Sequence, residues 1–163
     1  YGSIGRQTAR IARAFGMNVL SYSRTRRPEG EALARYVDFD TLLAQSDFVS
    51  LHCPLTPATA KLINADTLAK MKDGAILINT SRGALVDEPA LIAALQNGVI
   101  AGAGLDVQET EPPAADNPLY DMDNVILTPH MGWKGLETRQ RLVALLAGNI
   151  RSYLEGRPIH VVS

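Results

Sequence analysis

The hydrophobic residues of the chain follow two spacings in turn, one typical of helices and one typical of buried strands. Residues 5–15 carry apolar side chains at helical spacing, and Gly16 follows them as a C-terminal stop. Residues 17–23 form a short apolar run that predicts a buried strand, and the polar residues 24–30 predict a turn. The chain is therefore expected to begin with a helix and to continue into a strand.

The same alternation continues as far as residue 127. Asn64 stands where an N-cap is expected, at the start of one predicted helix. The pattern predicts helices over 41–44, 64–71 and 88–96 and strands over 48–52, 75–79, 99–107 and 125–127. Continuous apolar strands between helices indicate a parallel sheet covered on both faces, so we expect an α/β fold with a doubly wound parallel sheet.

The last predicted element is a long amphipathic helix over residues 135–154. Its apolar residues recur at helical spacing from Leu142 to Ile150. Three arginines form a basic stripe on the same helix, at Arg139, Arg141 and Arg151. We interpret this stripe as a solvated helix face.

Composition narrows the classes of partner. The chain has 163 residues, is 46% hydrophobic and carries a net charge of −1, which suits one domain and gives no broad electrostatic reason to bind nucleic acid or a membrane. No apolar run approaches the roughly 20 residues of a bilayer span. Cys53 is the single cysteine, and no ligand spacing links the three histidines, so we expect no metal and a soluble, cytoplasmic protein.

The first candidate site lies at the start of the first helix. Ligands of open parallel sheets bind outside the carboxyl ends of the strands. Gly2 and Gly5 match the second and third glycines of a G-x-G-x-x-G turn, where Gly2 would admit a pyrophosphate and Gly5 would let the helix pack closely. A plain N-cap turn is the alternative interpretation of the two glycines.

The second candidate site follows the strand predicted over 17–23. An acidic residue there would bind the ribose hydroxyls of NAD, but this chain has Ser23 and Arg24, followed by two further arginines, Arg26 and Arg27. Arginine suits a phosphate, so the turn favours NADP over NAD. A solvated basic loop is the alternative. The later loop at Cys53 and Pro54 could line the cofactor through its backbone, and a reactive thiol is the less favoured role for Cys53.

Three further polar clusters follow strands and could carry the chemistry. Arg82 leaves a buried strand and could bind the carboxylate of a 2-oxo acid through two parallel hydrogen bonds. His130 follows the last strand and could supply the proton that an alkoxide needs after hydride transfer. A carboxylate beside the imidazole would hold its proton, and both Glu109 and Glu111 follow the strand that ends near Asp106.

In these residues the chain resembles the D-isomer-specific 2-hydroxyacid dehydrogenases. Five motifs occur in the order and spacing of that family, and they span nearly the whole chain. They are Gly2-Ser3-Ile4-Gly5, His52-Cys53-Pro54-Leu55-Thr56, Ile78-Asn79-Thr80-Ser81-Arg82-Gly83, Gly104-Leu105-Asp106-Val107 with Glu111-Pro112, and Thr128-Pro129-His130-Met131-Gly132.

The resemblance implies a Rossmann-like domain that binds NAD(P) and a catalytic set of Arg82, Glu111 and His130. Glu111 is preferred to Glu109 because the family's glutamate falls five residues after the aspartate, here Asp106. The residues expected to contact the cofactor are Gly2, Ser3, Ile4, Gly5, Ser23, Arg24, Cys53, Pro54, Thr80, Ser81, Arg82, Asp106, His130 and Gly132.

Three parts of the family pattern are missing from the chain. The first glycine of the motif, the strand before it and the substrate domain are not in the sequence, so we expect residues 1–163 alone neither to fold cooperatively nor to catalyse turnover. Residues 1–133 are assigned to a dinucleotide-binding domain that is incomplete at its N-terminus. Residues 134–163 are assigned to a long helix and tail that return to the substrate domain.

Within the family, the sequence is most similar to glycerate dehydrogenases, also called hydroxypyruvate or glyoxylate reductases. The resemblance therefore implies hydride transfer between NAD(P)H and a small 2-oxo acid, in a homodimer. A corepressor family that senses nicotinamide cofactors has similar motifs. A non-catalytic NAD(H)-sensing protein of that type is the alternative function.

Overall fold

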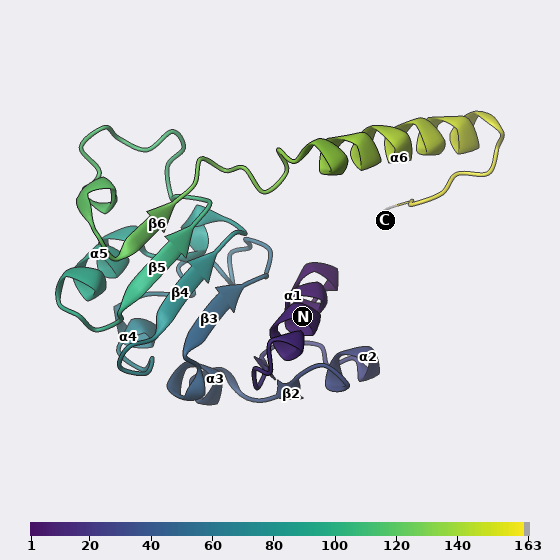
Figure 1. Cartoon of the computed structure of the whole chain (residues 1–163). Helices are drawn as coiled ribbons and strands as arrows, with labels where there is room; N and C mark the ends of the chain where they lie inside the picture. The colour runs from purple at the N-terminus through teal and green to yellow at the C-terminus, as the bar shows by residue number, and fades with distance from the viewer. Residues whose placement is uncertain (162–163) are drawn as a thin grey trace. The chain divides into compact units, whose positions relative to one another are not determined.

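The computed structural model describes residues 1–161. These form two compact units, Tyr1–Pro129 and a second unit that begins at His130. The last two positions of the tail assigned above, Val162 and Ser163, lie outside the described residues. Figure 1 shows the order of the elements along the chain, and strands alternate with helices through the whole first unit.

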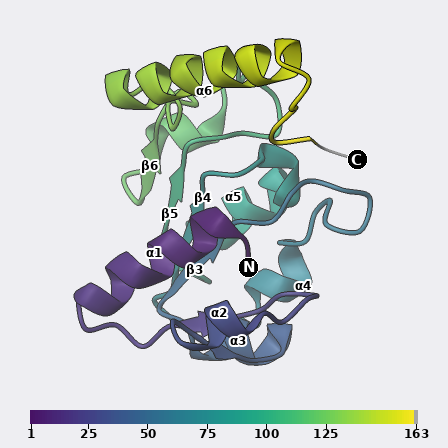
Figure 2. The same cartoon turned by 90° about the vertical axis from the view of Figure 1, so that its right-hand side faces the viewer.

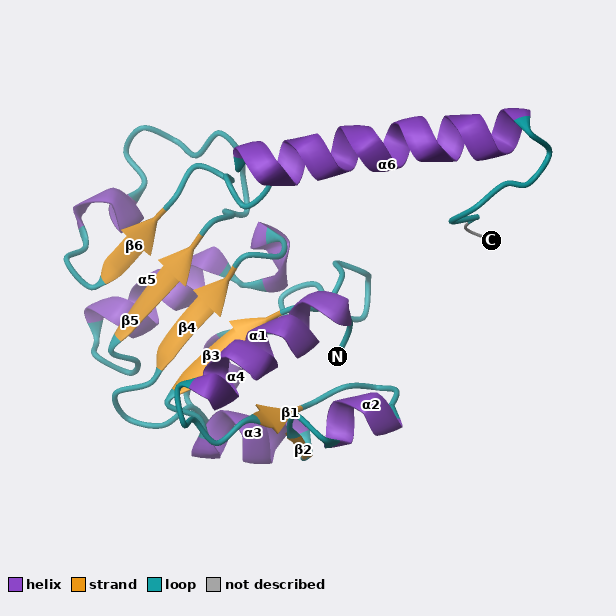
Figure 3. Ribbon diagram, turned by 45° about the vertical axis from the view of Figure 1, so that its right-hand side comes forward, coloured by secondary structure: helices purple, strands orange, loops and turns teal. Residues whose placement is uncertain are grey.

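The first unit contains six parallel strands in two sheets. The larger sheet has the order β3-β4-β5-β6, formed by Phe48–Leu51, Ile76–Asn79, Gly102–Leu105 and Val125–Leu127. The smaller sheet pairs β1 (Leu20–Ser21) with β2 (Arg35–Tyr36), also in parallel. In Figure 3 the arrows of the larger sheet all point the same way. The predicted parallel α/β architecture is confirmed.

Helices connect these strands and lie on both sides of the larger sheet. They are α1 (Ser3–Ala14), α2 (Pro28–Glu31), α3 (Phe39–Gln45), α4 (Ala65–Leu68) and α5 (Glu88–Gln96), with 3-10 turns η1 (Gly83–Leu85) and η2 (Pro118–Asp121). Figure 2 shows α1 on one side of β3 and β4 and α4 and α5 on the other. The predicted cap of α4 is confirmed, since the Asn64 side chain accepts hydrogen bonds from two backbone N–H groups of the first turn.

The hydrophobic core lies between the larger sheet and helices α3 to α5. Leu43, Leu68 and Leu91 come from the three helices, and Val49 and Leu77 come from the facing side of the strands. The opposite side of the sheet is less covered by the first unit, where Ile126 of β6 keeps 72% of its surface exposed. Within the first unit, the prediction that helices cover both faces of the sheet is met only in part. On the second face, α1 lies beside β3 and β4 and leaves β6 exposed.

Two predicted strands begin later than expected because glycine caps use their first residues, and both also end two residues early, before 22–23 and 106–107. At the end of α1, Gly16 has φ 80° and Met17 N–H donates to Ala12 O, which is a Schellman cap. At the end of α5, Val99 N–H donates to Ala94 O in the same way. The predictions of strand at 17–19 and at 99–101 were therefore wrong.

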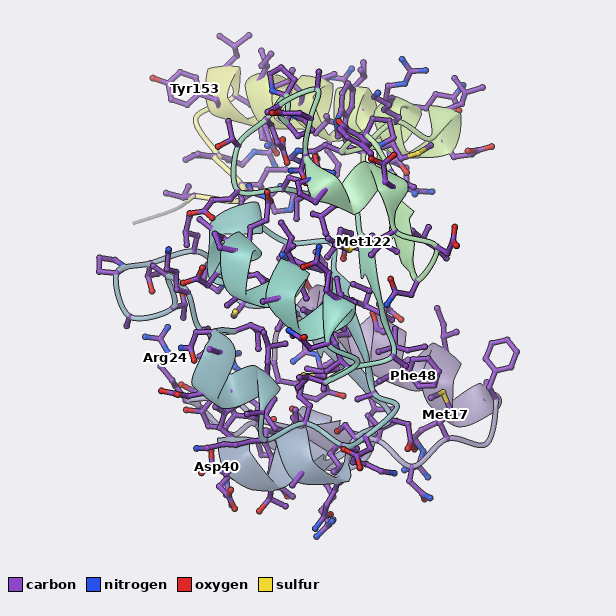
Figure 4. The ribbon with its side chains drawn as sticks, turned by 90° about the vertical axis from the view of Figure 1, so that its left-hand side faces the viewer. Met17, Arg24, Asp40, Phe48, Met122 and Tyr153 are labelled. Carbon is purple, nitrogen blue, oxygen red and sulfur yellow. The ribbon has the colours of Figure 1, made fainter. Side chains whose placement is uncertain are left out.

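The two sheets face each other across a cleft of about 1710 Å³ that is lined by parts of α1, β1 and β3. Strand β1 pairs with β2, and β3 pairs with β4, each on the side away from the cleft. Val37 N–H donates to Ser21 O in the first pair, and Ile76 N–H donates to Asp47 O in the second. Alternate backbone groups of β1 and β3 therefore point into the cleft. Met17 and Phe48, labelled in Figure 4, line it and are exposed.

The second unit consists mainly of α6 (Leu136–Leu154), close to the helix predicted over 135–154. None of the residues of α6 is buried in the structure, although the helix carries large apolar side chains such as Leu142, Leu146 and Ile150. Tyr153, labelled in Figure 4, projects from its last turn. Beyond the helix, His160 Nδ1 lies 2.9 Å from Asn149 Oδ1.

We predict that residues 1–163 alone unfold over a broad temperature range, because the cleft exposes two strand edges and apolar lining to water. An apolar extension of about six residues joined before Tyr1, placed as a parallel strand between β1 and β3, should give one sharp transition. Calorimetry of both proteins measures this. A matched extension with a central proline should fail to sharpen the transition. A single sharp transition of residues 1–163 by themselves would contradict the prediction.

Candidate active site

The carboxyl ends of the four strands of the larger sheet meet at one edge. Leu51 is in register with Asn79, Asn79 with Leu105, and Leu105 with Leu127. The segments that follow these four residues therefore leave the sheet side by side. They carry the polar clusters identified in the sequence, and Thr80, Ser81, Arg82 and Asp106 are brought to this edge.

Asn79 holds the turn that carries Arg82. It is only 1% exposed, its Oδ1 accepts a hydrogen bond from Ser81 N–H at 3.0 Å, and its Nδ2 donates to Arg82 O at 2.9 Å. Ser81 Oγ donates to Leu51 O at 2.8 Å and ties the turn to the end of β3. These bonds satisfy a buried amide on both its oxygen and its nitrogen, so the backbone at Arg82 has a defined course.

The Arg82 side chain lies at the surface of this edge. Its Nη1 donates to Ser81 O at 2.6 Å, and the residue is exposed. A guanidinium has five N–H donors in a planar fork, so this single bond leaves donors that can bind a carboxylate from outside. The arrangement suits recognition of a small anionic substrate.

Asp106 is a buried carboxylate at the same edge, with 7% of its surface exposed. Its backbone N–H donates to Asn79 O at 3.0 Å, and its Oδ1 accepts a hydrogen bond from Thr128 Oγ1 at 2.5 Å. Thr128 N–H in turn donates to Leu105 O. Asp106 thus joins the ends of β4, β5 and β6.

The two candidate acids lie on the loop that follows β5. Glu111 Oε1 accepts a hydrogen bond from Gln108 N–H at 3.1 Å, so its side chain folds back over the base of the loop. Glu109 is held through its backbone, because its N–H donates to Glu88 Oε2 at 3.2 Å. Both glutamates are exposed. The sequence analysis did not identify Glu88, since only the folded chain brings α5 beside this loop.

The N-terminus of α1 has the chemistry of an anion site. Gly2 is the N-cap residue, is exposed, and has no atom within 4 Å of the position a Cβ would take. No acidic residue stands in the first turn, where Ser3 and Ile4 are exposed. Gly5 is buried, and a Cβ there would lie 3.5 Å from the Cβ of His52. The helix start is therefore open toward solvent and close to the end of β3.

The turn after β1 is basic and is organised by an aromatic residue. Ser23 Oγ accepts a hydrogen bond from the Tyr1 amine at 2.7 Å, and Arg24, labelled in Figure 4, is exposed. The Arg26 guanidinium lies 5.7 Å from the centre of the Tyr36 ring, and the Tyr36 hydroxyl accepts a hydrogen bond from Arg27 N–H at 3.3 Å. Tyr36 was missed because β2 has only two residues and gives no periodic signal.

Cys53 and His52 are partly withdrawn from water at the end of β3. Burial raises the pKa of the Cys53 thiol, an effect that the nearby Arg24 opposes, so the thiol stays protonated at neutral pH. Burial also lowers the pKa of His52, whose Nε2 lies 3.0 Å from Ser50 Oγ. Thr59 Oγ1 donates to Pro54 O at 2.7 Å and fixes the loop. The site has no sign of a thiolate nucleophile at Cys53.

Seven of the fourteen predicted cofactor residues line one cleft, and two others belong to the second unit. The remaining five lie in the first unit but do not line the cleft, and they are Ser3, Ile4, Ser81, Arg82 and Asp106. The residues that line the cleft described above include Gly2, Gly5, Ser23, Arg24, Cys53, Pro54 and Thr80. His130 and Gly132 belong to the second unit, whose first residue is His130. His130 has φ 48°, a backbone conformation uncommon outside glycine, directly after Pro129 at the end of the first unit.

Residues 1–161 show neither a metal site nor a membrane-spanning helix. That part of the chain holds no group of three or more His, Cys, Asp or Glu side chains arranged to bind a metal ion. Within the same range, no helix combines the length and apolar character needed to cross a membrane.

Comparisons with known proteins agree on one family. The NAD-binding domain of the D-isomer specific 2-hydroxyacid dehydrogenases matches residues 1–132. A hydroxypyruvate reductase of Blautia hydrogenotrophica is 48% identical over 164 residues, which is 100% of this chain and 51% of that protein. A glyoxylate reductase of Thermococcus litoralis is 51% identical over 158 residues, 96% of this chain and 47% of that protein.

Solved structures give the same result. The crystal structure of a D-lactate dehydrogenase with NAD⁺ from Lactobacillus jensenii has a TM-score of 0.94 at 38% identity, covering 99% of this chain and 53% of that one. An acyclic imino acid reductase in complex with NADPH and D-Arg has a TM-score of 0.89 at 37% identity, covering 99% of this chain and 51% of that one. The chain spans about half the length of the relatives it matches.

We predict that Asn79→Ala in the complete protein lowers the free energy of unfolding by about 1–3 kcal/mol, because it leaves the Ser81 N–H and Arg82 C=O without their partner. Chemical denaturation measures the change. Asn97→Ala is the control, since the Asn97 side chain donates one bond from an exposed position and its loss should cost less than about 1 kcal/mol. Equal stability of Asn79→Ala and the parent protein would contradict the role of Asn79.

Proposed function

The chain belongs to the D-isomer specific 2-hydroxyacid dehydrogenase family, and we propose that the complete protein reduces hydroxypyruvate or glyoxylate with NAD(P)H. The observation that carries this proposal is the position of Arg82 at the edge where β4 and β5 end, with donors left for a carboxylate. Hydroxypyruvate and glyoxylate each offer a carboxylate next to the carbonyl that is reduced.

The residues around α1 fit a dinucleotide. The first turn has a free helix N-terminus, an open Gly2 and no acid, which together suit a pyrophosphate. Ser23 and Arg24 would hold the ribose and its substituent, with Cys53, Pro54 and Thr80 along the cleft. Asp106 would lie near the nicotinamide end, at the close of β5. The bound cofactor supplies the hydride.

Three side chains carry the rest of the proposed reaction. Arg82 binds the substrate carboxylate and orients the carbonyl. His130 gives a proton to the carbonyl oxygen as the hydride arrives, and takes it back in the reverse direction. Glu111 favours the protonated imidazole and fixes its orientation. Glu109 competes for this role, and the bond from Gln108 N–H to Glu111 supports Glu111 because it holds that carboxylate in one place.

We propose two domains for the complete protein, one for the cofactor and one for the substrate. Residues 1–133 form the cofactor domain, and residues 134–163 lead back toward a substrate domain that the relatives' greater length supports. We propose a homodimer in the cytoplasm, with no nucleic acid or membrane partner. The named relatives are reductases and dehydrogenases, which favours catalysis over the sensor-type alternative.

We predict that His130→Ala in the complete protein lowers kcat with hydroxypyruvate at least about a hundredfold, because general acid catalysis contributes that much or more. Cofactor affinity should change little. Oxidation of NAD(P)H with a panel of 2-oxo acids measures the rate, and His160→Ala serves as a control because His160 lies in the tail beside Asn149. Near-normal turnover of His130→Ala would remove it from the mechanism.

The cofactor preference gives a separate prediction. Ser23, Arg24 and the two arginines after them should make kcat/KM higher with NADPH than with NADH, because an arginine attracts the 2′-phosphate. Ser23→Asp should shift the ratio toward NADH by about tenfold or more, since a carboxylate repels the phosphate and accepts from the ribose hydroxyls. Ser23→Ala is the control for loss of the hydroxyl alone. A parent enzyme that already prefers NADH would contradict the prediction and leave the arginines as a solvated basic loop.

A further inference from the structure

Glu88 joins the start of α5 to the loop that carries the candidate acids. It is the first residue of α5 and is half-buried. One carboxylate oxygen, Oε2, accepts a hydrogen bond from Glu109 N–H at 3.2 Å, and the other, Oε1, accepts from Asn117 Nδ2 at 2.8 Å. A single side chain therefore holds two points of the loop, eight residues apart in sequence.

The second of these points is itself anchored in the core. Asn117 Oδ1 accepts a hydrogen bond from Leu119 N–H at 3.0 Å, and Leu119 is fully buried in the hydrophobic cluster. The amide of Asn117 thus connects the Glu88 carboxylate to a fixed turn, η2. The loop between Glu109 and Asn117 has both of its ends held, and Glu111 lies between them.

The segment that carries Arg82 contacts the same loop independently. A Cβ at Gly83 would fall on the carbonyl group of Gln108, so the two backbones approach too closely for a side chain at Gly83. Gln108 N–H also donates to Glu111 Oε1. Segment 82–88 therefore meets the loop at Gly83 and again at Glu88, and these two contacts set where Glu111 lies relative to Arg82.

We propose that Glu88 is a positioning residue that fixes the Glu111 loop against the Arg82 turn. This inference rests on the proposed function, since it gives Glu88 its effect through Glu111 and Arg82. Glu88 touches neither substrate nor cofactor in this account. It acts by holding the Glu109 backbone, and a shift of the loop by about 1 Å is enough to cost a large part of the rate.

The test compares four variants of the complete protein: Glu88→Ala, Glu88→Gln, Glu111→Gln and the double variant Glu88→Ala/Glu111→Gln. Asp66→Ala is the matched control, because Asp66 is also acidic, lies in the first turn of a helix and is exposed. Amide hydrogen exchange of residues 106–111 reports the loop directly. The rate of 2-oxo acid reduction as a function of pH reports the imidazole that Glu111 supports.

We expect Glu88→Ala to speed amide exchange at Glu109 at least tenfold and to lower kcat by about tenfold. The pH profile should shift in the direction that Glu111→Gln shifts it, and the double variant should be no slower than Glu111→Gln alone, because the two residues act in one path. Glu88→Gln keeps one oxygen acceptor and should recover part of both effects. Asp66→Ala should leave exchange and kcat unchanged.

Unchanged exchange at Glu109 in Glu88→Ala would overturn the proposal. The proposal would also be overturned if the double variant lost as much rate as the two single variants combined and Glu88→Ala left the pH profile unshifted. Glu88 would then have only a general structural role. If Glu88→Ala does not fold, Glu88→Gln is compared with the parent protein by amide exchange at Glu109 and by the pH profile of the rate. No change in either would overturn the proposal. A complete protein that reduces no 2-oxo acid would refute the proposed function, while the exchange data would still decide whether Glu88 holds the loop.

Discussion

The register of the parallel ladder from β3 to β6 is the constraint on which the candidate site depends. Leu51, Asn79, Leu105 and Leu127 occupy one level, so each strand ends beside its neighbour. Parallel pairing leaves all carboxyl ends on the same edge, so the polar residues that directly follow the strands lie together there. The buried amide of Asn79 then adds a side-chain bond that closes the turn at Arg82.

The cleft between the two sheets is lined in part by residues at this same edge, where β3 and β4 end. A parallel strand placed between β1 and β3 would make one sheet in which the strand order reverses direction beside α1. Such a reversal is where ligands bind in doubly wound sheets, and it would bring the open Gly2 next to the ends of β3 and β4. Completion of the sheet and formation of the cofactor site are thus one structural event in this account.

The sequence predicted those elements whose signal is local. The helix at 88–96 and the strand at 125–127 were predicted with the bounds they have, and the five motifs led to the correct family. The two-residue strand β2 gave no periodic pattern, and Met17 and Val99 were taken for strand although they close glycine caps. The bond between Glu88 and the Glu109 backbone spans 21 residues, and no local pattern could indicate it.

The most direct test of the central claim is amide hydrogen exchange of the complete protein with and without NADPH. We expect NADPH to add protection at residues 2–5, 79–83 and 106–108, because we propose that the start of α1 and the ends of β4 and β5 bind the cofactor. Residues 72–75 and 99–101, at the opposite edge of the sheet, should exchange at the same rate in both states. Protection confined to that opposite edge, or no protection at saturating NADPH, would contradict the account.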